Sequence, residues 1–168
     1  MRIAQRTNKV RRDLYYLSQE GFKRFKKRLR SLRNEHAHSL RTLRALKDAR
    51  SANKYEERIS LTEQVNQLQL IEEEIIETEY ILKKAKLLPR IRQATKVKLG
   101  SHVHLKGDGK ELAYTIVDPL EADPAQGKIS NESPFGQNLI GRKIRDVIQW
   151  SFGPAGAKPI NLQIVGIS

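Results

Sequence analysis

Two histidines offer the side chains best suited to binding a transition metal. His102 and His104 alternate along a segment with strand periodicity, so both side chains lie on one face and could grip a metal ion together. No third ligand lies within reach by sequence. We therefore interpret the pair as exposed strand histidines and predict no metal site there.

Three acids near the middle of the chain could hold a hard cation. Asp48, Glu56 and Glu57 supply carboxylate oxygens, the ligands that Mg²⁺ prefers. On an extended helix, however, Asp48 and Glu56 would stand about two turns apart. The neighbouring Arg50 and Lys54 would also repel a divalent ion. The sequence therefore predicts neither a catalytic residue nor a resident metal ion.

Positive charge is concentrated in the first third of the chain. Residues 1–58 hold 18 Lys or Arg against 6 Asp or Glu (+12), residues 59–90 hold 4 against 6 (−2), and residues 91–168 hold 10 against 7 (+3). Basic side chains gain free energy on nucleic acid by releasing condensed counterions, so this arm favours a polyanionic partner. The alternative is a solvated helix face kept soluble by charge repulsion. The cations in question are Lys23, Arg24, Lys26, Lys27, Arg28, Arg30, Arg33, Arg41 and Arg44.

A long helical segment must position these cations. Neither Gly nor Pro occurs from Phe22 to Leu88, and apolar residues recur at intervals of three and four, as in the seam of a coiled coil. Ser18 is expected to cap the first helix, and Pro89 is expected to end the second. The first seam comprises Phe22, Phe25, Leu29, Leu32, His36, Ser39, Leu43 and Leu46, with His36 and Ser39 as tolerated polar members; the second comprises Leu61, Leu68, Ile71, Ile75 and Leu82.

We expect this segment to fold back on itself. A single helix would extend about 100 Å and expose both seams to water. The seam fails between Lys47 and Arg58, where Ser51 and Asn53 favour a turn. The acidic run at residues 72–79 also complements the basic first arm. An antiparallel hairpin with its tip near residues 48–57 follows, and a coiled coil between two chains is the alternative.

The second half of the chain has the pattern of a small β-rich domain. After residue 95 the apolar period changes to about two. Gly107-Asp108-Gly109 is expected to join two strands within residues 101–117, and "DVIQWSF" and "INLQIVGIS" are expected to form a second pair. Residues 127–141 fit neither a helix nor an ordinary strand, and residues 138–146 have room for a short helix or turn.

The expected fold class is α+β, with three segments. They are a basic extension at residues 1–16, the helical hairpin at 17–90 and the β-rich domain at 91–168. The absence of cysteine fits a reducing compartment. Residues 1–9 lack the apolar run of a secretory signal, and no stretch approaches the roughly 18 apolar residues of a membrane helix. We expect a soluble, cytoplasmic protein.

Motifs in both halves resemble the Gre transcript-cleavage and elongation factors (GreA/GreB). "YLSQEGFKRFKKRL" at residues 16–29 is similar to the opening of the family's first helix. Residues 113–148 are similar almost throughout to its C-terminal signature, and the resemblance covers residues 15–168. The matching elements are Tyr114–Val117, Glu121–Asp123, Ile129-Ser130, Ser133-Pro134 and Leu139–Gly141.

The resemblance implies an antiparallel coiled-coil hairpin followed by an FKBP-like sheet domain. It also implies that the sheet domain docks at the rim of the secondary channel of bacterial RNA polymerase, while the hairpin reaches toward the active centre. Ser133, Pro134, Phe135 and Gly136 resemble the docking loop; a turn that merely closes the sheet is the alternative. The resemblance further implies a monomer that is not itself an enzyme, carries no cofactor of its own and has no membrane contact.

The tip departs from the family. Cleavage factors carry an acidic pair in a Gly-Asp-Leu-x-Glu-Asn motif, because a second Mg²⁺ must activate water at the polymerase active centre. Counted without gaps from Gly21, the pair falls on Ala52 and Tyr55; aligned on Asn53, it falls on Ala49 and Ala52. Both placements lose both carboxylates. The tip residues of interest are Asp48, Arg50, Ser51, Ala52, Asn53, Tyr55, Glu56 and Glu57.

Three hypotheses remain at this point. The first is a polymerase-binding elongation regulator that does not cleave, inhibitory or pause-modulating, whose arm residues Lys23, Arg24, Lys27, Arg30, Arg41 and Arg44 hold transcript RNA. The second is a cleavage-stimulating factor with a shifted acidic tip that binds Mg²⁺. The third is a basic RNA- or ribosome-binding protein derived from the same fold.

Overall fold

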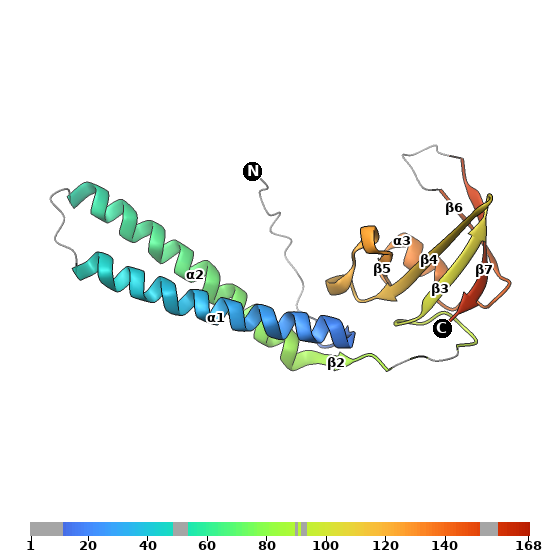
Figure 1. The fold of residues 1–168 in the computed structure, drawn as a ribbon, viewed down its shortest axis with the longest axis horizontal. Coiled ribbons are helices and arrows are strands. Elements are labelled where there is room, and N and C mark those ends of the chain that lie inside the picture. The colour runs from blue at the N-terminus through green and yellow to red at the C-terminus, as the bar shows by residue number, and fades with distance from the viewer. Residues whose placement is uncertain (1–11, 49–53, 90, 92–93, 152–157) are drawn as a thin grey trace.

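The chain forms a helical hairpin followed by a five-stranded sheet. The computed structural model describes residues 12–48, 54–89, 91, 94–151 and 158–168. The end of α1 and the start of α2 lie at the end of the hairpin farthest from the sheet (Figure 1). This arrangement confirms the predicted α+β class, with the hairpin preceding the sheet domain.

The hairpin consists of α1 (Gln19–Asp48) and α2 (Lys54–Lys84) of the same chain, packed against each other in antiparallel directions. Basic residues of α1 meet acidic residues of α2, as the charge pattern predicts. The fold-back is therefore intramolecular, in contrast to the two-chain alternative. The ion pairs are Arg28–Glu74 (2.8 Å) and Arg33–Glu79 (2.8 Å), and His36 Nε2 lies 2.9 Å from Glu72 Oε1.

The hairpin seam is only partly apolar. Leu32 and Ile71 are buried between the helices, but so are Ser39 and Thr78. The hydroxyl of Thr78 donates a hydrogen bond to the carbonyl of Glu74 in the same helix, at 2.7 Å. Small polar residues therefore allow close packing at these positions without leaving the Thr78 donor unpaired.

The root of the hairpin differs from the prediction. Helix α2 ends at Lys84, not at Pro89, because Ala85–Leu87 forms strand β2. This strand pairs in parallel with β1 (Tyr15–Leu17), and the Leu88 amide donates to the Leu17 carbonyl at 2.9 Å. Extended pairing with a segment near the N-terminus thus outcompetes the last helical turn. The sequence predicted neither strand.

Ser18 caps α1 as predicted. Its Oγ accepts a hydrogen bond from the Gly21 amide at 3.0 Å. This bond satisfies one of the free amides in the first turn of the helix.

The sheet has the strand order β5-β4-β3-β7-β6. All neighbouring strands are antiparallel except β4 and β5, which are parallel. Both predicted strand pairs are confirmed, as β3–β4 and β6–β7. The strands are β3 (His102–Gly107), β4 (Lys110–Val117), β5 (Lys128–Ser130), β6 (Val147–Trp150) and β7 (Ile160–Ile167).

The β3–β4 turn follows the predicted chemistry. Asp108 has φ 51° and Gly109 has φ 71°, both in the left-handed region that tight hairpin turns require. Of the residues expected in the β6–β7 connection, residues 152–157 lie outside the described part of the chain.

Residues 127–141 contain more regular structure than predicted. Lys128–Ser130 forms the edge strand β5, paired with Thr115–Val117, and Pro134–Leu139 forms helix α3. A three-residue strand is too short to show a period of two, and the helix is set by a local cap. Of the short helix or turn expected at residues 138–146, the helix begins earlier and ends at Leu139, and the segment after it contains turns.

Helix α3 covers one face of the sheet and completes its core. In the apolar core of the sheet domain, Phe135 and Leu139 of α3 pack with Val103, Leu105 and Ile116 of the strands. A second, smaller cluster lies at the hairpin root, around Tyr15, Leu17 and Ile81, and Leu120 packs against it from the segment after β4. The segment after β4 contains the short 3-10 helices η1 (Pro119–Glu121) and η2 (Pro124–Gln126).

Candidate functional site

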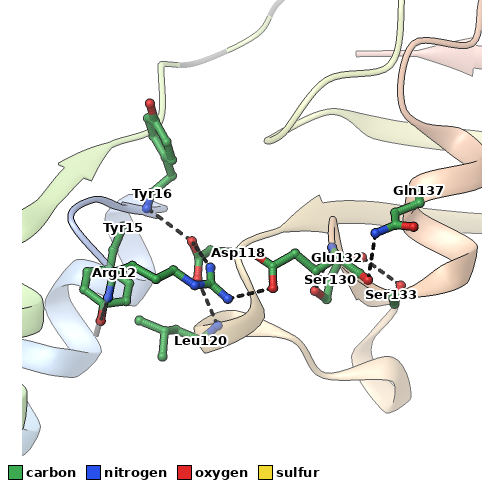
Figure 2. Close-up of polar contacts among 9 residues, drawn as sticks. All are labelled: Arg12, Tyr15, Tyr16, Asp118, Leu120, Ser130, Glu132, Ser133 and Gln137. Carbon is green, nitrogen blue, oxygen red and sulfur yellow. Dashed lines mark hydrogen bonds and ion pairs between the residues drawn. The ribbon is translucent and has the colours of Figure 1, made fainter. Parts of the chain in front are cut away.

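The predicted docking loop is held by a local network of hydrogen bonds. Ser133 caps α3: its Oγ accepts from the Gly136 amide at 3.0 Å and donates to the Ser130 carbonyl at 2.7 Å. The Glu132 amide donates to Ser130 Oγ at 3.1 Å, and Gln137 Nε2 donates to the Glu132 carbonyl at 3.3 Å (Figure 2). The loop therefore presents a fixed shape.

The four residues predicted for docking divide into one exposed and three structural positions. Pro134 is exposed at the first position of α3, whereas Phe135 and Gly136 are buried. A Cβ at position 136 would overlap the Ser130 carbonyl, so only glycine fits there. Ser133, Phe135 and Gly136 shape the loop, and Pro134 is the member that a partner could touch.

An apolar hollow of ≈ 420 Å³ lies beside Pro134. The rings of Tyr114 and Trp150 line it together with Phe135, whose ring lies 5.3 Å from that of Tyr114 and 4.9 Å from that of Trp150. Sequence reasoning did not place Tyr114 and Trp150 at this hollow, because they lie on the non-adjacent strands β4 and β6 and are brought together only by their shared contact with Phe135 of α3. A single tryptophan in the chain was the available signal.

The hairpin tip is described only in part. Asp48 is exposed at the end of α1, and Tyr55, in the first turn of α2, has 74% of its surface exposed. Glu56 and Glu57 follow within α2. Arg50, Ser51, Ala52 and Asn53 lie outside the described residues.

The predicted basic arm also divides into engaged and exposed members. Arg24 is engaged at the hairpin root, where its Nη2 donates to the Leu120 carbonyl at 3.1 Å. The other five predicted residues are exposed, and no ion pair joins them to another described residue. They recur at helical spacing along about 30 Å of α1 and can present a row of positive charge. These five are Lys23, Lys27, Arg30, Arg41 and Arg44.

The two strand histidines pair with neighbours. A ring nitrogen of His102, Nδ1, lies 2.9 Å from Thr115 Oγ1, and the two imidazole rings stand edge to face at 4.9 Å. Among the described residues, no cluster of three or more His, Asp or Glu side chains could hold a metal ion. Within that same part of the chain, no helix is both long and apolar enough to cross a bilayer.

These features define a class of two-part proteins: a charged helical rod joined at its root to a sheet domain with a rigid loop. The family model described as "Transcription elongation factor, GreA/GreB, C-term" matches residues 92–168. The transcription elongation factor GreA of Acholeplasma laidlawii is 33% identical over 159 residues, covering 94% of this chain and 98% of the relative. GreA of Thermoanaerobacter pseudethanolicus is 34% identical over 158 residues, covering 90% and 95%. The chain therefore belongs to the GreA/GreB family of transcription elongation factors.

A solved structure gives a weaker likeness over a similar length. The GreA factor homolog 1 (Gfh1) of Thermus thermophilus is 26% identical, with 92% of this chain and 99% of that chain covered and a TM-score of 0.43. The family assignment rests on the sequence relatives.

Proposed function

We propose that this Gre-family elongation factor binds bacterial RNA polymerase and regulates elongation without stimulating transcript cleavage. The sheet domain would dock at the rim of the secondary channel, and the hairpin would enter the channel with its tip toward the active centre. The rod-like hairpin and the rigid α3 loop support this arrangement. With that partner, the protein would act in the cytoplasm as a monomer.

Docking is assigned to the loop of Ser133, Pro134, Phe135 and Gly136. Exposed Pro134 offers an apolar contact, and the hollow formed by Tyr114, Phe135 and Trp150 is large enough to accept a nonpolar side chain. Such a combination of a buried aromatic anchor site and a pre-formed loop favours binding without a large ordering cost.

The observation that carries the non-cleaving assignment is the sequence of the tip. Neither placement of the acidic pair, on Ala52 and Tyr55 or on Ala49 and Ala52, retains a carboxylate. A second Mg²⁺ at the polymerase centre needs hard oxygen ligands from the factor. Without them, the hairpin occupies the channel but activates no water. The protein is thus neither an enzyme nor a carrier of its own cofactor.

The basic arm is assigned to transcript RNA. The exposed residues Lys23, Lys27, Arg30, Arg41 and Arg44 would lie along the phosphates of RNA extruded into the channel. Arg24 belongs to the hairpin root through its bond to Leu120 and is expected to contribute less. Contacts to RNA without cleavage would prolong or shorten pauses according to which state of the complex they stabilise.

The test is a stalled, backtracked complex of purified bacterial polymerase, with and without the protein. The proposal expects altered elongation or pausing with transcripts of unchanged length. Shortened transcripts that disappear in a Glu56→Ala, Glu57→Ala variant would instead establish a cleavage factor with a shifted tip. Failure to bind polymerase at low and moderate salt, with steeply salt-dependent binding to naked RNA, would establish the RNA-binding alternative.

A further inference from the structure

A buried carboxylate joins the two parts of the molecule. Glu121, in η1 of the sheet domain, has 2% of its surface exposed. One carboxylate oxygen, Oε2, accepts from the Ser18 amide at 2.6 Å, and the other, Oε1, accepts from the Ser18 hydroxyl at 2.6 Å. Ser18 is the cap of α1. Both oxygens of Glu121 are therefore used at the start of the hairpin.

The start of α1 is shaped to receive this carboxylate. A Cβ at position 21 would overlap the Glu121 carboxyl group, so glycine at position 21 leaves the space that the carboxylate fills. The positive end of a helix dipole also favours a negative charge at this position. Gly21 and Glu121 belong to two motifs a hundred residues apart in sequence, and the structure makes them one contact.

A second buried carboxylate extends the contact toward the docking loop. Asp118 has 3% of its surface exposed, and its carboxylate accepts from the Tyr16 amide at 3.3 Å and from the Leu120 amide at 3.1 Å. Arg12 lies 3.7 Å from Asp118 and 2.7 Å from Glu132, the residue before Ser133. Figure 2 shows this chain of polar contacts from the root of the hairpin to the loop.

Directional hydrogen bonds are part of this connection. Its apolar contacts include Leu120 against the cluster of Tyr15, Leu17 and Ile81, and nonpolar contacts tolerate sliding and rotation. The two hydrogen bonds from Ser18 to the carboxylate oxygens of Glu121, both 2.6 Å long, resist such movement, because the strength of a hydrogen bond falls steeply with its angle. The bonds of Glu121 therefore restrict the orientation of the hairpin in a way that apolar packing does not.

We propose that Glu121 is a positioning residue that fixes the direction in which the hairpin leaves the sheet domain. A helix of 30 residues is about 45 Å long, so a tilt of about 10° at its root moves the tip by about 8 Å. For a factor that docks by one part and acts by the other, this angle decides where the tip arrives. That consequence rests on the proposed function, whereas the angle itself can be measured on the free protein.

The test measures the distance between the two parts. The chain has no cysteine, so Asn66→Cys on α2 and Gln149→Cys on β6, both exposed, provide two unique sites for spin labels. In the otherwise unchanged protein, pulsed electron paramagnetic resonance should give one narrow distance distribution. Glu121→Gln keeps the size of the side chain, but the NH2 group of glutamine is a hydrogen-bond donor and would face one of the two donors of Ser18. The distribution should broaden or shift in this variant.

The matched control is Glu20→Gln. Glu20 also contacts the sheet domain, through Lys128 at 3.6 Å, but its side chain is 85% exposed. Exposed pairs contribute little, so this variant should keep the narrow distribution. An unchanged distribution in a folded Glu121→Gln variant overturns the proposal. If circular dichroism shows that this variant fails to fold, Ser18→Ala, which removes one of the two bonds, replaces it: a broadened or shifted distribution supports the proposal, and an unchanged one overturns it.

The functional readout separates positioning from docking. If Glu121→Gln leaves one molecule in ten in the productive orientation, the concentration for half-maximal effect on elongation should rise about tenfold. Gly21→Ala, which displaces the carboxylate, should behave likewise, and Glu20→Gln should match the unchanged protein. A protein without substitutions that fails to bind polymerase would refute the proposed function but leave the distance result standing.

Discussion

Arg145 adopts a backbone conformation that suits glycine better than arginine. Its φ is 79°, and its amide donates to the Ile164 carbonyl at 2.8 Å, which anchors the turn before β6. A left-handed conformation costs an L-residue about 1–2 kcal/mol, and a glycine at this position would avoid that cost. The greater freedom of glycine in the unfolded chain opposes this gain in stability by roughly 0.5–1 kcal/mol. We predict that Arg145→Gly raises the free energy of unfolding by about 0.5–1 kcal/mol.

Urea denaturation followed by circular dichroism measures this change. The control is Arg142→Gly, which makes the same change of side chain and charge three residues earlier, where φ is not positive. It should lower the free energy of unfolding by about 0.5–1 kcal/mol. Equal destabilisation by both variants would contradict the assigned strain.

Pro134 gives a second prediction at the scale of a single residue. Because Pro134 is exposed and alanine also suits the start of a helix, Pro134→Ala should leave the unfolding transition nearly unchanged. Truncating a contact residue at an interface often costs more than 1 kcal/mol, so polymerase binding should weaken about five- to tenfold. Pro159→Ala, also exposed but distant in sequence from the loop, is the control. Equal affinities for both variants, measured by titration with purified polymerase, would remove Pro134 from the interface.

At the scale of elements, the exposed face of α1 should control RNA binding. Lys27→Glu with Arg30→Glu removes two adjacent cations from the basic arm. Each phosphate contact on a single strand contributes about −0.7 to the slope of log K against log salt, so the slope should become less negative by about 1.4. Lys96→Glu with Lys98→Glu makes the same change of net charge on exposed residues outside the hairpin. Fluorescence anisotropy with single-stranded RNA over a salt series compares the two double variants. Identical slopes would indicate that the exposed face of α1 is solvated and binds no RNA.

Elements with a strong local signal were predictable, and elements made by distant pairing were not. The absence of Gly and Pro from residues 22–88 and the three-four spacing indicated the hairpin, and Gly107-Asp108-Gly109 indicated the β3–β4 turn. Strand β2 replaced the expected last turn of α2 because β1 pairs with it, and three residues carry no readable period.

The candidate site shows the same limit. Ser133-Pro134 marks the start of α3 through a cap and a proline, which act within a few residues. Tyr114 and Trp150 come from β4 and β6, and Glu121 lies 103 residues from Ser18. Such encounters depend on the assembled sheet, so periodicity and spacing cannot reveal them. The tip is a different case, because its assignment rests on sequence positions alone.

For the whole molecule, the proposals assign separate roles to the body and the tip. The hairpin, its junction at Glu121 and the proposed docking loop would determine where the tip arrives, and the residues at the tip would determine what happens there. If this division is correct, restoring the acidic pair should convert the protein into a cleavage-stimulating factor without altering its body. Ala52→Asp with Tyr55→Glu tests one placement, and Ala49→Asp with Ala52→Glu tests the other.

We predict that one of these two variants shortens transcripts in backtracked complexes in the presence of Mg²⁺, because a carboxylate pair at the motif positions can supply oxygen ligands that the natural residues at those positions do not. The matching amide variants, Ala52→Asn with Tyr55→Gln and Ala49→Asn with Ala52→Gln, preserve side-chain size without the charge and should leave transcripts intact. Gain of cleavage by the amides would show that shape rather than metal binding is responsible. If neither acidic variant cleaves although both compete with the unchanged protein for polymerase, the tip does not reach the active centre, and the missing acids do not explain the proposed lack of cleavage.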